Sequence, residues 1–174
     1  AIISYDGYMG WQNVYKKPEL LNAKQYAEIM DEAWTNSGKK PYNFAILVPD
    51  WDKIESGEWN GTNWFDEIVY KNAPVTSHSL NVIGGTAKST FSLGASYLHE
   101  QGILGKQANS VYKRLNFRLN SEHILIEKGG RNILVLGENL TYTNTKKPMV
   151  RTGNIYWSDV HNMMVTSPFL PMYD

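Results

Sequence analysis

Three things are missing from this sequence: cysteine, net charge and any long apolar run. Without cysteine among its 174 residues, the chain has no disulfide bond and no thiolate metal site. Its 17 Lys and Arg balance 17 Asp and Glu, so no overall charge draws it toward nucleic acid or an anionic membrane. A mean hydropathy of -0.42 and the absence of any long apolar run together exclude a transmembrane helix. Transmembrane β-strands stay open, because their alternating residues average to a polar value.

An N-terminal methionine and a signal peptide are also missing. We therefore expect a processed chain or one segment of a longer polypeptide, and the length suits one domain or one large piece of a domain. Aromatic residues, by contrast, are abundant: they make up 13% of the chain, with 11 Tyr and 6 Trp.

Apolar and polar residues alternate in five segments, and this period of two predicts five β-strands. The segments are "IISYDGYMGWQNV", the two arms of "VTSHSLNVIGGTAKSTFSLGASYLHEQG", "VYKRLNFRLNSEHILIE" and "ILVLGENLTYTNT". Tight turns are expected at 84–88 and 128–132, and longer connections at about 15–76, at 102–110 and from 146 onward. In an antiparallel meander this order puts the tight turns at one end and the long connections at the other.

The tight turn at 84–88 opens with Gly84 and Gly85, which we expect to supply a positive φ. Within the longer connections, Asn22 is a good N-cap, and helical spacing continues from it to Trp34. Shorter helices are expected near 50–55, 63–70 and 159–165.

The alternating apolar face could point into a protein core or into lipid. If it points into a core, the chain is expected to be a soluble carbohydrate-binding β-sandwich or adhesin module. Strands of about ten residues and polar faces made of Ser, Asn, Gly, Thr and Arg favour a bilayer crossing with a wet lumen. Aromatic residues near both ends of the strands are typical of interfacial girdles. These are Trp11, Tyr97 and Tyr142 toward the long connections, and Tyr5 and Phe91 toward the tight turns. Glu138 breaks the apolar face, so we expect a bulge or register shift there.

Several stretches, taken together and in order, resemble the SusC/RagA-like family of TonB-dependent outer-membrane transporters of Bacteroidota. They are "ISYDGYMGWQNVYKKPELLNAKQYAEIMDEA", "NWFDEIVYKNAPVTSHSLNVIGGTAKSTFSLGASYLHEQGIL", "YKRLNFRLNSEH", "GENLTYTN" and "TSPFLPMYD". The resemblance spans nearly the whole chain, except for "NFAILVPDWDKIESGEWNG", which matches no family motif.

The resemblance implies an all-β fold: an antiparallel meander of about five long strands within a larger, 22-stranded outer-membrane β-barrel, with short helices in the long extracellular loops. Residues 1–174 would form one segment of this barrel, following a plug domain. The chain contains neither the plug nor the remaining strands, and five strands alone cannot close a barrel.

By the same resemblance, the parent protein would import nutrients across the cell outer membrane, with oligosaccharides or other glycans as the main expectation and peptides as the alternative. Its partners would be the plug and the rest of the barrel, outer-membrane lipid, a SusD-like surface lipoprotein over the extracellular mouth, and TonB acting through the absent plug. Nucleic acid is not among the expected partners.

Two groups of residues are candidates for contacts in such a protein. The first is expected to face the lumen and to touch either the transported solute or the plug: Asp6, Tyr8, Gln12, Arg114, Asn116, Arg118 and Asn120. The second consists of loop tryptophans, Trp51, Trp59 and Trp64, which could stack on sugar rings through their apolar faces. Packing within the loop or against the lipoprotein is the alternative role for these three.

The sequence offers little for bond chemistry. None of the four His stands at ligand spacing to another, and no phosphate loop or nucleophile elbow is present. Asp50, Asp52 and Glu55 could suggest a cation site, but acidic residues also favour the start of a solvated helix. We therefore expect no catalytic residue, no metal and no cofactor, and the chain is not predicted to be an enzyme.

Overall fold

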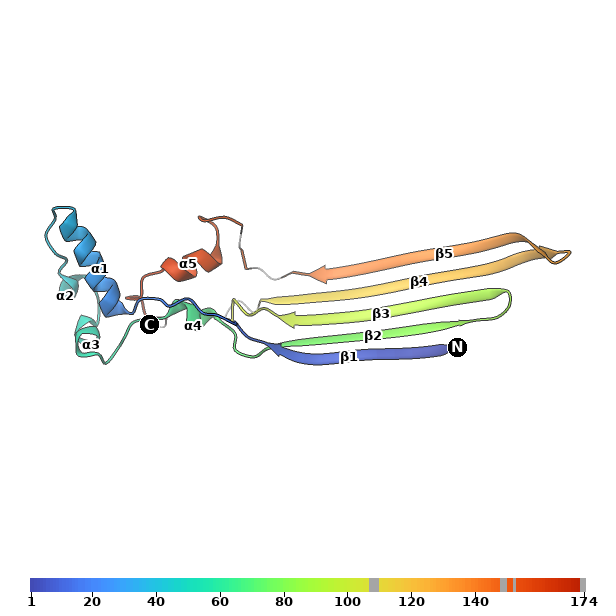
Figure 1. Cartoon of the computed structure of the whole chain (residues 1–174), viewed down its shortest axis with the longest axis horizontal. Coiled ribbons are helices and arrows are strands. Elements are labelled where there is room, and N and C mark those ends of the chain that lie inside the picture. The colour runs from blue at the N-terminus through green and yellow to red at the C-terminus, as the bar shows by residue number, and fades with distance from the viewer. Residues whose placement is uncertain (107–109, 148–149, 152, 173–174) are drawn as a thin grey trace. The chain divides into compact units, whose positions relative to one another are not determined.

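The computed structural model describes residues 1–106, 110–147, 150–151 and 153–172, which contain five strands and five helices (Figure 1). The strands are β1 (Ile2–Gln12), β2 (Ala73–Gly85), β3 (Ser89–Gln101), β4 (Val111–Lys128) and β5 (Arg131–Lys146). The helices are α1 (Ala23–Asn36), α2 (Phe44–Leu47), α3 (Trp51–Ser56), α4 (Trp64–Ile68) and α5 (Asp159–Val165). None of these helices has the length and apolar character that crossing a membrane requires.

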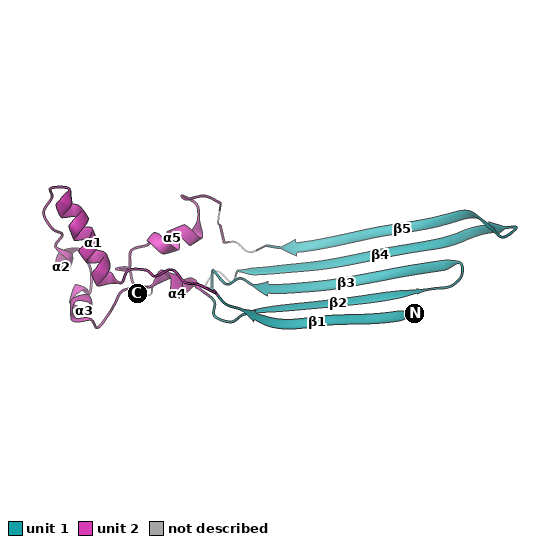
Figure 2. Ribbon diagram, viewed as in Figure 1, with its two compact units in different colours: residues 1–13, 70–149 teal, residues 14–69, 150–174 magenta. Residues whose placement is uncertain are grey.

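The chain forms two compact units (Figure 2). The first, residues 1–13 with 70–149, holds all five strands. The second, residues 14–69 with 150–174, holds the helices. That residues 1–174 form a single segment of a longer barrel stays a prediction.

The five strands form one open antiparallel sheet in the order β1-β2-β3-β4-β5, so each strand pairs only with its neighbours in sequence (Figure 1). This confirms the predicted five-stranded antiparallel meander. The strands are 11 to 18 residues long, longer than the expected ten. The tight turns β2–β3 and β4–β5 lie at one end of the sheet, and the longer connections leave from the other.

The hydrogen-bonded register decides which side chains share a face, because residues directly opposite in an antiparallel ladder point the same way. One row across the sheet consists of Tyr5, Leu80, Ala95, Phe117 and Tyr142. Counting in steps of two from this row gives one mostly apolar face, and the intervening rows give one mostly polar face. The predicted division of each strand is therefore present, and the five strands are aligned so that like faces coincide.

Glu138 does not lie at an irregularity, contrary to expectation. The register runs without interruption through the pair Ser121 and Glu138, and the shifts on β4 lie instead between Ile124 and Glu127. The carboxylate therefore stays on the apolar face, where Glu138 Oε2 accepts a hydrogen bond from Ser121 Oγ at 3.2 Å. Ser121 on the neighbouring strand thus gives the carboxylate a polar partner on the apolar face. The bulge that alternation suggested at Glu138 is absent.

The two tight turns use glycine for different reasons. Gly129 and Gly130 have φ values of 58° and 72°, in the left-handed region that glycine favours. Gly84 and Gly85 do not have positive φ, so the expected reason is wrong for them. At Gly85 the constraint is close approach: a Cβ there would lie 2.9 Å from Thr90 Cα and would also meet the carbonyl oxygen of Ser89.

The helical unit has its own small core. Its buried residues Ala23, Val48 and Ile54 pack with four partly buried aromatic side chains: Phe44, Trp51, Trp59 and Phe169. Helix α1 begins at Asn22 as predicted, with a capping box in which Gln25 N donates to Asn22 Oδ1 and Asn22 N donates to Gln25 Oε1. The helices expected near 50–55, 63–70 and 159–165 are present as α3, α4 and α5, and α2 was not predicted.

The close approach at Gly85 makes a testable prediction. Gly85→Ala places a methyl group against the backbone of β3, so we expect it to destabilise the folded protein by about 2 kcal/mol. Gly10→Ala is the matched control, because a Cβ at Gly10 would meet nothing within 4 Å. Urea unfolding of both variants measures the difference, and equal midpoints would contradict the close approach.

Candidate functional site

The seven residues predicted to face a lumen lie on one face of the sheet, the polar face. Asp6, Tyr8 and Gln12 are on β1, and Arg114, Asn116, Arg118 and Asn120 are on β4. Because β2 and β3 lie between these strands, the two groups are not in direct contact. The structure thus brings them to a common surface without joining them in one cluster.

Small polar residues fill the space between the two groups. In the row of Asp6 these are Ser79 on β2 and Ser96 on β3, followed by Asn116 and Thr143. Asn116 Nδ2 donates to Ser96 Oγ at 3.2 Å, and Thr143 Oγ1 donates to Asn116 Oδ1 at 3.0 Å. These two bonds fix the orientation of the Asn116 amide and leave its second N–H for another acceptor.

The charges on this face are distributed unevenly. Arg114 and Arg118 are exposed and stand four residues apart on β4, about 13 Å along the strand. Neither forms an ion pair with another residue that the structure describes. Glu100, an acidic residue of this face on β3, does have a partner: its Oε1 accepts a hydrogen bond from Gln12 Nε2 of β1 at 2.9 Å. The polar face therefore carries two guanidinium groups ready to bind an acceptor.

The opposite face is mostly apolar, and two groups of hydrogen-bonded polar side chains lie on it. Large side chains such as Ile3, Trp11 and Leu140 are more than half exposed in the chain as it stands. In the first group, Tyr5 Oη lies 2.7 Å from His78 Nδ1. The second joins three strands: Ser89 Oγ lies 2.5 Å from His123 Nδ1, His123 Nε2 lies 3.2 Å from Ser121 Oγ, and Ser121 reaches Glu138.

The three predicted loop tryptophans are packed within the helical unit. Trp51 and Trp59 contact its core, and the ring of Trp51 stacks on Phe44 with centroids 5.0 Å apart. Trp64 donates from Nε1 to the carbonyl oxygen of Ser167 at 3.0 Å. All three are partly buried, and within the described residues no ring contact joins any two of them. The contacts support the packing alternative, and a role in binding stays a prediction.

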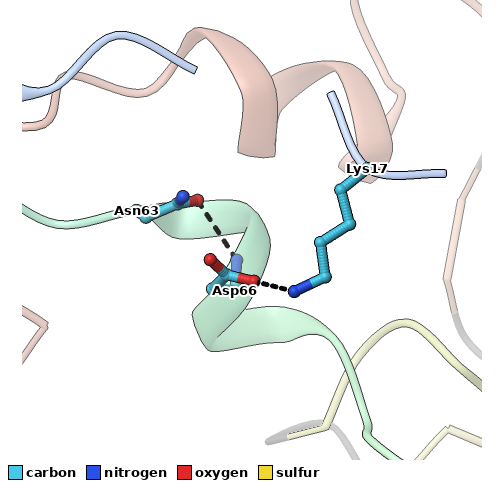
Figure 3. Close-up of polar contacts among 3 residues, drawn as sticks. All are labelled: Lys17, Asn63 and Asp66. Carbon is cyan, nitrogen blue, oxygen red and sulfur yellow. Dashed lines mark hydrogen bonds and ion pairs between the residues drawn. The ribbon is translucent and has the colours of Figure 1, made fainter. Parts of the chain in front are cut away.

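Helix α4, which carries Trp64, is held in place by polar contacts near its first turn (Figure 3). Asn63 Oδ1 accepts a hydrogen bond from Asp66 N at 3.2 Å, and the Asp66 carboxylate forms an ion pair with Lys17 Nζ. These contacts attach the segment that follows β1 to the segment that precedes β2. They fix the position of α4 and therefore of Trp64. The contact with Lys17 could not be predicted from the residues next to Trp64, because Lys17 is distant in sequence.

Two exposed aromatic residues of the helical unit, Tyr156 and Trp157, were not among the contact residues predicted from the sequence. Tyr156 and Trp157 are 81% and 67% exposed. Asn154 Oδ1 accepts from the backbone N–H groups of both at 2.9 Å, and Ser158 caps α5 by accepting from His161 N. The signal was available in "NIYWSD", where an Asx turn and a helix N-cap bracket an aromatic pair.

Among the residues that the structure describes, no group of three or more His, Asp or Glu is placed to hold a metal ion. Of the acidic residues near α3, Asp50 pairs with Lys53 Nζ at 2.8 Å. The hydrogen bond from Lys53 and the charge of Asp50 raise the pKa of Lys53. Asp50 thus contributes to a local ion pair, and the expectation of no metal stays a prediction.

Comparison with models of protein families, with curated proteins and with solved structures finds no match to this chain.

The packing of the tryptophans predicts unequal effects of mutation. Trp51→Ala removes a ring from the core of the helical unit and should destabilise that unit by about 3 kcal/mol or more. Trp157→Ala removes an exposed ring and should change stability by less than about 0.5 kcal/mol. Limited proteolysis of residues 14–69 in the two variants tests this. Equal protection of the segment would show that Trp51 is not part of the core.

Proposed function

We propose that this chain forms barrel strands and extracellular loops of a TonB-dependent outer-membrane importer for oligosaccharides. Transport, in this proposal, is gated passage past the polar face and involves no bond chemistry. The observation that carries the proposal is the exposed apolar face of the sheet, on which the apolar residues of the two outer strands are offset along the strand direction.

On β1 the apolar band runs from Ile3 to Trp11, whereas on β5 it runs from Leu134 to Tyr142 and is interrupted by Glu138. Tyr142 stands in the row of Tyr5, so the band is displaced by about six residues between the two outer strands. Six residues span about 20 Å along a strand, and four strand spacings span about 19 Å across the sheet. If the band lies in the membrane plane, the strands tilt by about 45° from its normal, close to the tilt of known barrels.

The same displacement accounts for the aromatic residues at the ends of the band. Tyr5 and Tyr142 share a row, yet Tyr5 is near the tight-turn end of β1 and Tyr142 is in the half of β5 nearer the long connections. In a sheet tilted by about 45°, residues of one row on β1 and β5 differ in depth by about 13 Å. The two tyrosines of one row therefore differ in depth, with Tyr5 nearer the side of the tight turns and Tyr142 nearer the side of the long connections.

The open edges of the sheet support a larger barrel. Within the described residues β1 and β5 each pair on one side only, and every residue of β5 is exposed. Unpaired backbone groups are not tolerated in lipid, so further strands of the parent protein must satisfy them. The resemblance to SusC/RagA-like transporters gives 22 strands as the expected total and places a plug inside the barrel.

In this proposal each part of the chain has a place in the importer. The polar face, with Asp6, Arg114 and Arg118, borders the path of the solute or the plug. The long connections reach the cell exterior, where a SusD-like lipoprotein would cover them. Exposed rings such as Trp157 fit either that lipoprotein or a sugar ring. Energy would come from TonB acting on the plug.

A pair of adjacent substitutions on β5 tests the proposal. Leu140→Arg puts a charge on the apolar face and Asn139→Arg puts the same charge on the polar face. In a bilayer we expect Leu140→Arg to destabilise the folded protein by about 2–4 kcal/mol and Asn139→Arg to have little effect. Urea unfolding of the full-length protein from phospholipid vesicles measures both.

Two outcomes would count against the importer. If the full-length protein is found in the soluble fraction and both arginine variants are as stable as the wild type, the apolar band does not face lipid. If the apolar face proves to be covered by a second sheet, the carbohydrate-binding β-sandwich is the better reading.

A further inference from the structure

An open hollow of about 270 Å³ lies on the polar face over Gly94, near the middle of β3. Gly94 stands between Asn81 on β2 and Arg118 on β4, in a row that continues to Thr141. Because glycine has no side chain, its backbone forms the floor and its neighbours form the walls. The polar side chains that line the hollow are Ser79, Asn81, Ser96, Asn116, Arg118 and Thr141.

The walls are rich in hydroxyl and amide groups, several of them already oriented. Asn116 is held by Ser96 and Thr143, and Asn81 Nδ2 lies 3.5 Å from Ser79 Oγ. A Cβ on Gly94 would lie 3.1 Å from Asn81 Oδ1, so this oxygen borders the floor directly. Fixed amides and hydroxyls both donate and accept, and they match the hydroxyl groups of a sugar ring.

The charge of the hollow comes from one residue. Arg118 is exposed, no acidic side chain lines the hollow, and Arg118 forms no ion pair within the described residues. A guanidinium presents a planar fork that binds a carboxylate through two parallel hydrogen bonds. The lining therefore combines several neutral hydrogen-bonding groups with one site for an anion.

We propose that this hollow is a binding subsite for an acidic saccharide, with Arg118 holding the carboxylate of a uronic acid. The amides of Asn81 and Asn116 and the hydroxyls around them bind the ring hydroxyls, and Gly94 leaves room for the ring. The size of the hollow, near the lower end for ligand pockets, suits one ring of a longer glycan. The inference rests on the proposed function, in which solute passes along this face.

The test uses the full-length protein that carries this chain, purified in detergent, and two matched probes. These are trigalacturonate and its carboxyl-reduced counterpart, which differ only in the charged groups. Isothermal titration should give an affinity about tenfold to a hundredfold higher for the acidic probe, the range for a hydrogen-bonded charge. Raising the salt concentration should reduce this preference.

Arg118→Gln should abolish the preference, because it lowers the affinity for the acidic probe much more than the affinity for the neutral one. Arg131→Gln, which removes an arginine at the β4–β5 turn, is the charge-matched control and should keep the preference. Gly94→Gln fills the floor and should weaken the binding of both probes, so it reports on the hollow independently of charge.

Three results would overturn the subsite. They are equal affinities of the wild type for both probes, an Arg118→Gln variant that keeps the preference, and a Gly94→Gln variant that binds like the wild type. If Arg118→Gln lowers the melting temperature while the preference persists, a carboxylate of the same polypeptide, such as one in a plug, occupies Arg118. Fractionation of cells separates the two proposals: an Arg118-dependent preference in a protein found outside the outer membrane would remove the importer and retain the site.

Discussion

The hydrogen-bonded register of the sheet is the constraint on which the other features depend. A slip of one residue between two strands would move a whole strand's apolar side chains to the polar face. The observed register instead aligns the five strands so that apolar residues meet apolar ones, as in the row from Tyr5 to Tyr142. The apolar face, the hollow over Gly94 and the pairing of Glu138 with Ser121 all follow from this single alignment.

The two units are stabilised in different ways. The helical unit buries its own apolar groups, with aromatic rings such as Phe44 and Phe169 packed around Ile54. The sheet unit is held by its ladders, and its large apolar side chains remain exposed along the strands. An exposed apolar face of this extent requires a covering medium, since apolar surface in water costs about 25 cal/mol per Å². The proposed bilayer would meet that requirement without a second sheet.

Much of the fold was predictable, because alternation of apolar and polar residues is a strong sequence signal for β-strands. Alternation located the strands and faces, and Asn22 located the start of α1 through its capping chemistry. The roles of individual loop residues were not predictable in this way. Trp51 and Trp157 look equivalent in sequence, but packing against Phe44 half-buries one and an Asx turn at Asn154 exposes the other. Glu138 was misjudged because Ser121, its partner, lies 17 residues away.

The connectivity of the sheet also sets an order of assembly. Strands β2 to β5 join through two tight turns and the connection at 102–110, so their ladders form between segments that are close in sequence. Pairing of β1 with β2, however, must bring Gln12 to Ala73 across the whole of residues 14–69. Folding of that intervening segment, tied by Lys17 to Asp66, shortens the effective loop and lowers its closure entropy. We therefore expect the β1–β2 ladder to form after the ladders of β2 to β5.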